Sequence, residues 1–369
     1  MGFCPDFFIN FALPVKSKEL GASAFEVGGL FSLFTLSLLL LRPLVGHAFD
    51  RFGRRWFLCV AIVLYVIAYT GYGFAEEITS MYAARFLQGI GAALLLLSID
   101  AITADLTDST DRASAMGKNL EAQTRSTFIE ATLGFGLIAA LPEQGWQISF
   151  AIFACMAMYA LFAVGRNVPE TLVKKPHELS QPVSTDFYKL MIWLVPLGFA
   201  SALIMPIYLV YLSDWFTADK RALSWAFLPA GLVFAILPAK LGRLVDRFGP
   251  RVPLILGSTV LIGLYVLMPF APGFWLVVTV YTASSVAWAL IEPARKSLTS
   301  QLSGHQTARG FGLAKMAFGV GGVLGPLVGG YVYDHYEPSL VFYLNASVVV
   351  LSLIVLFLWL PRVEILQND

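Results

Sequence analysis

Long apolar stretches alternate with short polar breaks along this chain. Eleven of the stretches are long enough to cross a bilayer, whose hydrocarbon core is about 30 Å thick and needs about 20 mainly apolar residues per helix. They are centred near residues 35, 66, 90, 132, 156, 200, 231, 262, 283, 321 and 349. The pattern predicts an all-α membrane protein with eleven complete spanning helices.

A twelfth apolar stretch, at the beginning of the sequence, is incomplete. Only Met1 to Val15 precedes the charged turn K-S-K-E-L-G-A-S, and at 1.5 Å per residue this gives about 22 Å of helix. Either the true start codon lies upstream or the chain has lost half a helix. A cleaved signal peptide is disfavoured, because no basic residue precedes the apolar run and no A-x-A-like site follows it.

A nine-residue phrase occurs twice in the sequence. G-H-A-F-D-R-F-G-R begins at Gly46, and G-R-L-V-D-R-F-G-P begins at Gly242, which is 196 residues further on. Such a duplication predicts two parallel halves, an architecture of secondary transporters in which the substrate site lies near the membrane midplane between the halves. We expect helix bundles over residues 1–165 and 187–369, joined by a polar cytoplasmic linker over residues 166–186 that contains three prolines.

Composition supports a membrane protein and excludes several other classes. Hydrophobic residues make up 57% of the chain and charged residues 13%, and the mean hydropathy is +0.73. Basic residues lie mainly on one side of the expected helices, which predicts a cytoplasmic C-terminus and, with twelve spans, a cytoplasmic N-terminus. Because these residues are spread over separate loops, the net charge of +1 does not indicate nucleic-acid binding.

The sequence gives no sign of a cofactor or of enzyme chemistry. Cys4, Cys59 and Cys155 lie in apolar stretches without paired spacing, and no two of the four histidines have metal-ligand spacing. There is no G-x-x-x-x-G-K-[ST] motif for nucleotide hydrolysis and no evident nucleophile–base pair. We therefore expect no metal, no cofactor and no enzymatic activity.

The repeated phrase resembles the loop motif of the major facilitator superfamily, G-x-x-x-D-[RK]-x-G-[RK]-[RK]. The first copy matches it at Gly46, Asp50, Arg51, Gly53, Arg54 and Arg55, and the second at Gly242, Asp246, Arg247, Gly249 and Arg251. The resemblance extends over essentially the whole chain. It implies a twelve-helix fold of two six-helix bundles, here with a truncated first helix, that moves a small molecule by alternating access.

In the family that the chain resembles, these loops form a latch on the cytoplasmic face. The resemblance implies that the eleven motif residues join in a network that closes this face when the carrier is outward-open and breaks when it inverts. The alternative interpretation is that the arginines only fix the topology of the chain.

A second phrase, R-F-L-Q-G-I-G-A-A, begins at Arg85 and is followed by A-D-L at residues 104–106. It resembles a family pattern whose arginine in the fourth helix is linked to proton coupling. A guanidinium about six residues inside a span is costly, so Arg85 should face a partner or a water-filled cavity. The alternative is that its side chain extends to the nearer membrane interface.

The stretch centred near residue 132 contains an unusual number of charges. Glu121, Arg125 and Glu130 should cluster broadly on one side of a helix. An internal Glu–Arg pair lowers the cost of burial and leaves a protonatable carboxylate beside a fixed positive charge. We interpret the cluster as a proton or substrate site with Glu130 as the proton carrier and Arg125 tuning it. The alternative is a structural ion pair.

Three further polar residues are candidates for coupling or substrate binding. Asp6 and Asn10 are four residues apart and share one face of the first apolar stretch, which in the family often lines the cavity. Glu292 is followed by Arg295 and Lys296, and for this carboxylate an ordinary pairing with the two cations is favoured over a role in transport.

Small residues recur every four positions around residue 321. The ridge consists of Ala317, Gly321, Gly325 and Gly329 and is interrupted by Pro326, a pattern typical of close helix packing. It resembles a glycine–proline motif that antiporters of the family carry in their fifth helix. Here the corresponding stretch near residue 132 lacks the proline, which weakens the case for drug–proton antiport.

These features together predict a secondary active transporter. Our first choice is proton-coupled efflux of a hydrophobic or amphipathic compound, because the expected cavity contains few charges and many aromatic and methionine side chains. The alternatives are proton-driven uptake of a sugar or organic acid, and a membrane receptor or scaffold that does not transport. The expected partners are a small-molecule substrate, protons and the lipid bilayer, with the chain acting as a monomer in the cell membrane.

Overall fold

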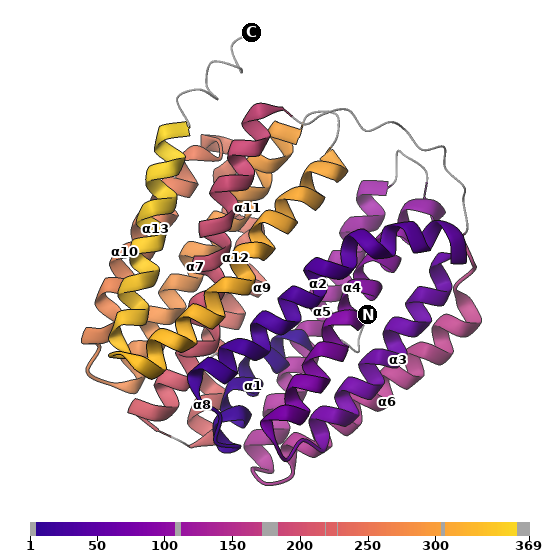
Figure 1. The fold of residues 1–369 in the computed structure, drawn as a ribbon, viewed down its shortest axis with the longest axis horizontal. Helices are drawn as coiled ribbons and strands as arrows, with labels where there is room; N and C mark the ends of the chain where they lie inside the picture. The colour runs from indigo at the N-terminus through magenta and orange to yellow at the C-terminus, as the bar shows by residue number, and fades with distance from the viewer. Residues whose placement is uncertain are drawn as a thin grey trace. The chain divides into compact units, whose positions relative to one another are not determined.

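The computed structural model describes residues 5–107, 112–171, 184–217, 219–226, 228–303 and 307–359. Within these ranges the secondary structure is entirely helical (Figure 1). The first six helices are α1 (Asp6–Glu19), α2 (Ala24–Phe52), α3 (Arg54–Gly73), α4 (Ile78–Leu106), α5 (Arg112–Ala140) and α6 (Gly145–Asn167). The others are α7 (Thr185–Trp215), α8 (Lys220–Ala226), α9 (Leu228–Phe248), α10 (Arg251–Leu267), the 3-10 helix η1 (Met268–Phe270), α11 (Phe274–Ser303), α12 (Thr307–His335) and α13 (Ser339–Trp359).

All eleven predicted stretches coincide with a helix, which confirms the all-α prediction. Length and hydropathy alone mark most of these helices as candidate spans. In the described part of the chain, nine helices are long and apolar enough to cross a membrane, or ten if α9, which bends by 48° between Pro238 and Lys240, is one span. The helix α5 is not among them. It contains Lys118, Arg125 and Glu130, whose charges lower its mean hydropathy.

The chain forms two compact units. The first contains Met1–Ala22 and Leu33–Leu179, and the second contains Ser23–Ser32 and Ser180–Asp369. The change at residue 180 falls inside the segment that the sequence suggests as a linker, while the expected domain bounds at 165 and 187 stay a prediction. The beginning of α2 belongs to the second unit, whereas the rest of α2 belongs to the first.

An aromatic cluster around Phe8 forms part of the core of the first unit. The Phe8 ring of α1 lies 4.9 Å from that of Phe135 on α5 and 5.9 and 5.4 Å from those of Phe150 and Phe153 on α6, measured between centroids. The edge-on and tilted geometries are those that aromatic rings prefer. The contacts attach the short helix α1 to two longer ones.

Backbone-to-backbone packing joins α7 and α12 in the second unit. A Cβ atom added to Gly321 would collide with the carbonyl oxygen of Val195, and one added to Gly325 would lie 2.5 Å from that of Phe199. From the other side, a Cβ on Gly198 would collide with the carbonyl oxygen of Phe318. Lipid tails are as apolar as leucine, so such close approach is a main source of helix association in a membrane.

We predict that Gly321→Ala destabilises the protein by about 1–3 kcal/mol, because the added methyl group would meet rigid backbone. Gly263→Ala on α10 is the matched control, since nothing lies within 4 Å of a Cβ built there. Thermal unfolding of both variants in the same detergent is the measurement. Equal midpoints for the two variants would contradict the close α7–α12 contact.

Candidate functional site

Five polar side chains from three helices form a buried cluster in the first unit, which we call the Arg85 cluster. The Arg85 side chain is only 1% exposed. Its Nη2 donates to Asn10 Oδ1 and its Nη1 to Gln88 Oε1, both at 2.9 Å. Gln88 Nε2 donates to Asp6 Oδ1 at 3.2 Å, and the Tyr72 hydroxyl donates to Gln88 Oε1 at 2.9 Å.

Helical spacing places these groups within reach of one another. Asp6 and Asn10 lie one turn apart on α1, and Arg85 and Gln88 lie one turn apart on α4. The Arg85 guanidinium also lies 4.4 Å from the centroid of the Phe34 ring, a distance suited to a cation–π interaction. Arg85 therefore faces partners inside the unit rather than extending to an interface.

The Arg85 cluster combines a permanent cation with a protonatable carboxyl group. An ionised Asp6 balances the charge of Arg85, whereas a protonated Asp6 leaves the pair with a net positive charge. Gln88 was not among the predicted site residues, although its position three residues after Arg85 in the R-F-L-Q phrase is a usable signal. Nothing in the sequence around Tyr72 indicates its part in the cluster.

The charges of α5 lie in different environments. Glu130 is 1% exposed, whereas the Arg125 side chain is exposed. The Glu121 side chain lies outside the described residues, so the expected three-residue cluster stays a prediction. Glu130 precedes Gly134 by one turn, and a Cβ on Gly134 would collide with the ring of Phe8. Glu130 therefore lies on the side of α5 that faces α1.

A compact network surrounds the end of the first motif copy. Arg54 Nη1 lies 2.5 Å from Asp105 Oδ2, and the same nitrogen donates to the carbonyl oxygen of Thr171. The carboxylate of Glu170 accepts from the backbone N–H groups of Arg54 at 2.7 Å and Thr171 at 3.0 Å. Because α3 begins at Arg54, Glu170 satisfies an N–H group at the positive end of a helix dipole.

Gly53 is required in this network for two reasons. Its φ of +83° is in the region that favours glycine, and a Cβ there would lie 2.6 Å from the Glu170 carboxyl carbon. The next residue, Arg55, donates through Nη2 to the carbonyl oxygen of Gly165. The side chains of Asp50 and Arg51 and the surroundings of Gly46 lie outside the described residues.

The second motif copy has the same backbone turn but a different environment. Gly249 has a φ of +70° and so matches Gly53. Asp246 and Arg247 are exposed, Gly242 has open space around it, and Arg251 is half-buried. The two copies therefore share a left-handed glycine, while the described buried ion pair belongs to the first copy.

The start of α2 is held by a single carboxylate from α12. Asp334 accepts the backbone N–H of Ala24 at Oδ1, at 2.9 Å, and that of Phe25 at Oδ2, at 2.7 Å. Ser23 and Glu26 add a reciprocal capping box, in which Ser23 N donates to Glu26 Oε2 at 2.8 Å and Glu26 N to Ser23 Oγ at 3.2 Å. Four backbone N–H groups at this helix end are thereby satisfied.

Close packing continues for two turns beyond this cap. Ser32 Oγ donates to the carbonyl oxygen of Val323 at 2.6 Å. A Cβ on Gly28 would collide with the carbonyl oxygen of Pro326, and one on Gly330 would collide with that of Ala24. We call this contact between Ser23–Ser32 and α12, including the Asp334 cap, the α2–α12 clasp.

Glu292 is paired within its own helix. Its carboxylate lies 2.6 Å from Arg295 Nη2 and 3.3 Å from Lys296 Nζ. This is the ordinary pairing that the sequence favours for this residue.

Comparisons with known proteins agree with the helical architecture. Residues 1–187 and 197–368 match the sequence model of the Major Facilitator Superfamily. The chain is 21% identical to the quinolone resistance protein NorA of Staphylococcus aureus over 345 residues, which cover 91% of this chain and 88% of NorA. It is 24% identical to multidrug resistance protein 1 of Bacillus subtilis (strain 168) over 339 residues, which cover 87% of this chain and 84% of that protein.

A solved structure shows the same fold. It is a bacterial homologue of the human lysosomal transporter Spinster, in an inward-facing and unoccupied conformation. The TM-score is 0.76 at 15% sequence identity, and the match covers 97% of this chain and 94% of the other.

We predict that Asp105→Asn destabilises the protein by about 3–5 kcal/mol, because it leaves the Arg54 guanidinium buried without its carboxylate. Replacing both partners, Arg54→Met with Asp105→Leu, should restore most of the loss, since no buried charge remains. Thermal unfolding in one detergent compares the single and double variants with the unmodified protein. A double variant as unstable as Asp105→Asn alone would show that packing, not charge pairing, is what the pair contributes.

Proposed function

Because the chain belongs to the Major Facilitator Superfamily of membrane transporters, we propose that it exports a hydrophobic or amphipathic small molecule by alternating access, driven by inward movement of protons. The observation that carries this proposal is the Arg85 cluster. A permanent cation and a protonatable carboxyl group lie in the interior of the first unit and are linked through Gln88. Ionisable residues inside membrane segments are expensive and mark ion or proton pathways.

In this proposal Asp6 is the proton carrier. Its protonation changes the summed charge of Asp6 and Arg85 from zero to positive, which can bias an equilibrium between two conformations. Glu130 is the second candidate, because it too is a buried carboxyl group on a helix that faces α1. If Glu130 is the proton carrier, we propose that the positive charge of Arg125 adjusts its affinity for protons.

The similar proteins support the proposed direction of transport and the proposed class of substrate. Two curated relatives are named for resistance to quinolones and to multiple drugs, which favours export of amphipathic compounds. At 21–24% identity this supports a substrate class rather than a particular substrate. Proton-driven uptake of a sugar or organic acid remains the alternative. A scaffold that does not transport is disfavoured, because it has no use for the buried charges of Arg85 and Glu130.

Two sets of contacts are proposed to control the conformational change. The network of Arg54, Asp105 and Glu170 fixes the motif loop at the start of α3. The α2–α12 clasp holds residues 23–32 to the second unit, while the remainder of α2 belongs to the first. Separation of residues 23–32 from α12 would therefore open the clasp.

The basic residues suggest an orientation for the protein in the membrane. We place the protein in the cell membrane as a monomer, with the motif loops and the C-terminus on the cytoplasmic side, where the basic residues concentrate.

Transport into proteoliposomes with an imposed pH gradient tests the function as a whole. The probes are ethidium as an amphipathic aromatic cation, a radiolabelled hexose and a radiolabelled dicarboxylate. Gradient-dependent movement of ethidium supports the proposal. Gradient-dependent uptake of the hexose or the dicarboxylate instead would select the alternative, and movement of none of the three would count against export of this class.

For the coupling residue, we predict that Asp6→Asn abolishes accumulation against a gradient but leaves downhill exchange measurable, because the carrier loses its titratable group and keeps its shape. Glu130→Gln is the matched comparison, since it makes the same change at the other buried carboxyl group. Both variants are assayed in the same proteoliposomes. If Asp6→Asn accumulates substrate normally and Glu130→Gln does not, then Glu130 is the carrier. If both accumulate substrate normally, coupling lies elsewhere.

For the clasp, we predict that Asp334→Asn raises the thiol-labelling rate of a cysteine placed at Ser32 about tenfold or more, because a charge-assisted cap at two N–H groups is lost. Ser32 is 4% exposed beneath the clasp, so its labelling reports opening. A membrane-impermeant maleimide is used after the native cysteines are replaced by alanine. Glu337→Gln removes the same charge three residues further on and is the control. Equal labelling of the two variants would refute the gating role.

A further inference from the structure

The end of α9, Lys240–Phe248, has three cations on one outward face, and we call it the α9 terminal segment. Lys240, Arg243 and Arg247 are exposed, and their spacing of three and four residues places them on the same side of the helix. Within the residues that the structure describes, none of these three side chains forms an ion pair or a hydrogen bond. The Arg247 guanidinium lies 5.2 Å from the centroid of the Phe248 ring.

The arginines of the first motif copy, in contrast, have partners within the protein. Arg54 pairs with Asp105, and Arg55 donates to the carbonyl oxygen of Gly165. The cations of the α9 terminal segment face outward instead, so their charge is available to a partner in the surroundings of the helix.

The position of these cations along the chain corresponds to a membrane boundary. Residues 222–239 are 18 residues without a charged side chain. At about 1.5 Å per residue they correspond to about 27 Å of helix, close to the thickness of about 30 Å of a hydrocarbon core. Lys240 is the first charge after this run, and α9 bends by 48° between Pro238 and Lys240. The α9 terminal segment therefore begins at the level of the lipid headgroups.

The cationic face continues the outward face of the span. Leu232 and Ile236 are exposed, and their spacing of four residues places them in line with Lys240. Val245, on the inner side of the α9 terminal segment, is buried. Exposed leucine and isoleucine side chains in a span contact lipid tails, so the cations that follow them meet the headgroups of the same lipids.

Apolar side chains lie beside the cations on the α9 terminal segment. Leu244 and Phe248 are both exposed and lie one turn apart. Exposing such side chains to water is unfavourable. A helix at a membrane surface places them among the lipids and keeps its cations level with the phosphates.

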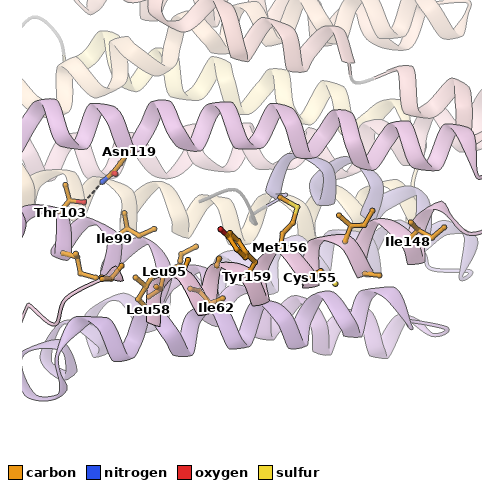
Figure 2. A pocket seen from close by; sticks show the side chains of 17 residues that line it. Leu58, Ile62, Leu95, Ile99, Thr103, Asn119, Ile148, Cys155, Met156 and Tyr159 are labelled. Carbon is orange, nitrogen blue, oxygen red and sulfur yellow. Dashed lines mark hydrogen bonds between the residues drawn. The ribbon is translucent and has the colours of Figure 1, made fainter. Parts of the chain in front are cut away.

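The open pocket beside α3, α4 and α6 in the first unit lacks this combination (Figure 2). Among the described residues that line it, Asn119 donates to Thr103, and none is charged. The tails of any lipid can cover such a surface, so it has no means of selecting a headgroup. The α9 terminal segment has that means.

We propose that the α9 terminal segment binds the headgroups of anionic phospholipids in the leaflet that it faces. Its three cations outnumber its one carboxylate, Asp246, so its charge is complementary to a negatively charged headgroup. A cation close to an anionic membrane surface strengthens binding about fivefold. Fixing the topology of the chain requires cations in the loop but not their alignment with exposed apolar side chains. In the orientation proposed above, this leaflet is the cytoplasmic one.

The first experiment compares an anionic with a zwitterionic lipid on the purified full chain. Phosphatidylglycerol or phosphatidylcholine is added in the same detergent, and thermal unfolding is measured. Phosphatidylglycerol should raise the midpoint by at least about 3 °C more than phosphatidylcholine does, because it binds the folded protein. The difference should shrink at high salt, which screens exposed charges.

Charge variants assign this effect to the α9 terminal segment. Lys240→Gln with Arg243→Gln should remove more than half of the difference between the two lipids, and Arg243→Gln alone should remove part of it. Arg243→Lys, which keeps the charge, should retain most of it. Arg166→Gln is the matched control, since it removes an exposed arginine at the end of α6 and should leave the difference unchanged.

Spin labelling provides a second readout that does not depend on stability. After the native cysteines are replaced by alanine, a nitroxide is attached through Leu244→Cys or through Asp246→Cys, two positions on opposite sides of the helix. In vesicles that contain phosphatidylglycerol, the ratio of accessibility to oxygen over accessibility to a water-soluble nickel chelate should be several-fold higher at position 244 than at position 246. In phosphatidylcholine vesicles this contrast should weaken.

Two results would overturn the proposal. One is that the Lys240→Gln, Arg243→Gln variant keeps as much of the lipid effect as Arg166→Gln does, or that the two lipids have equal effects on the unmodified protein. The other is that the labels at positions 244 and 246 are equally accessible to the nickel chelate, which would place the segment in water and leave its cations a role in topology alone. Neither readout involves transport, so the lipid site and the proposed transport function are tested separately.

Discussion

The charge of Arg85 is the constraint on which the interior of the first unit depends. A guanidinium cannot lose its proton in a protein, so at 1% exposure it must find hydrogen-bond acceptors inside the unit. It finds them on Asn10 of α1 and Gln88 of α4, and Gln88 in turn bonds to Asp6 and Tyr72. Three helices are thereby held around one cation, and the carboxyl group of Asp6 lies where a change in its protonation alters the charge of the cluster.

The same requirement to satisfy polar groups explains the ends of the helices. In a membrane protein, unpaired backbone N–H groups are especially costly wherever water is excluded. Glu170 satisfies one at the start of α3, and Asp334 satisfies two at the start of α2. Both carboxylates come from distant parts of the sequence, 116 and 310 residues away. Each cap is thus also a tertiary contact, and it breaks if the two segments separate.

Contacts between residues far apart in the sequence are also the part of the structure that could not be predicted. The long apolar stretches located the helices, and the cost of burying a charge implied that Arg85 has partners. Gln88 lies on the same helix as Arg85, and its spacing of three residues could have identified it. The identity of Tyr72 as a partner could not be predicted, because it depends on which helix faces lie together. The same holds for Glu170 and Asp334, which occupy polar segments without a distinguishing pattern. The stretch at α5 forms the predicted helix of 29 residues, and its charges explain why hydropathy alone marks it less clearly than the other stretches.

The two repeated halves have kept their backbone turns but differ in how their buried charges are satisfied. In the described part of the second unit, the buried Arg295 is paired with Glu292 on its own helix. The carboxylate that pairs with Arg295 therefore moves with the same helix, and the contact of Arg295 with another helix is to the Phe318 ring of α12, 4.7 Å away, which does not titrate. In the first unit the partners of Arg85 and Arg54 come from other elements, namely Asn10 on α1 and Asp105 on α4. Only a charge whose partners lie on another element can link protonation to a movement between elements. This difference is the physical reason to seek the coupling chemistry in the first unit and to regard the close-packed glycines of α12 as the scaffold of the second.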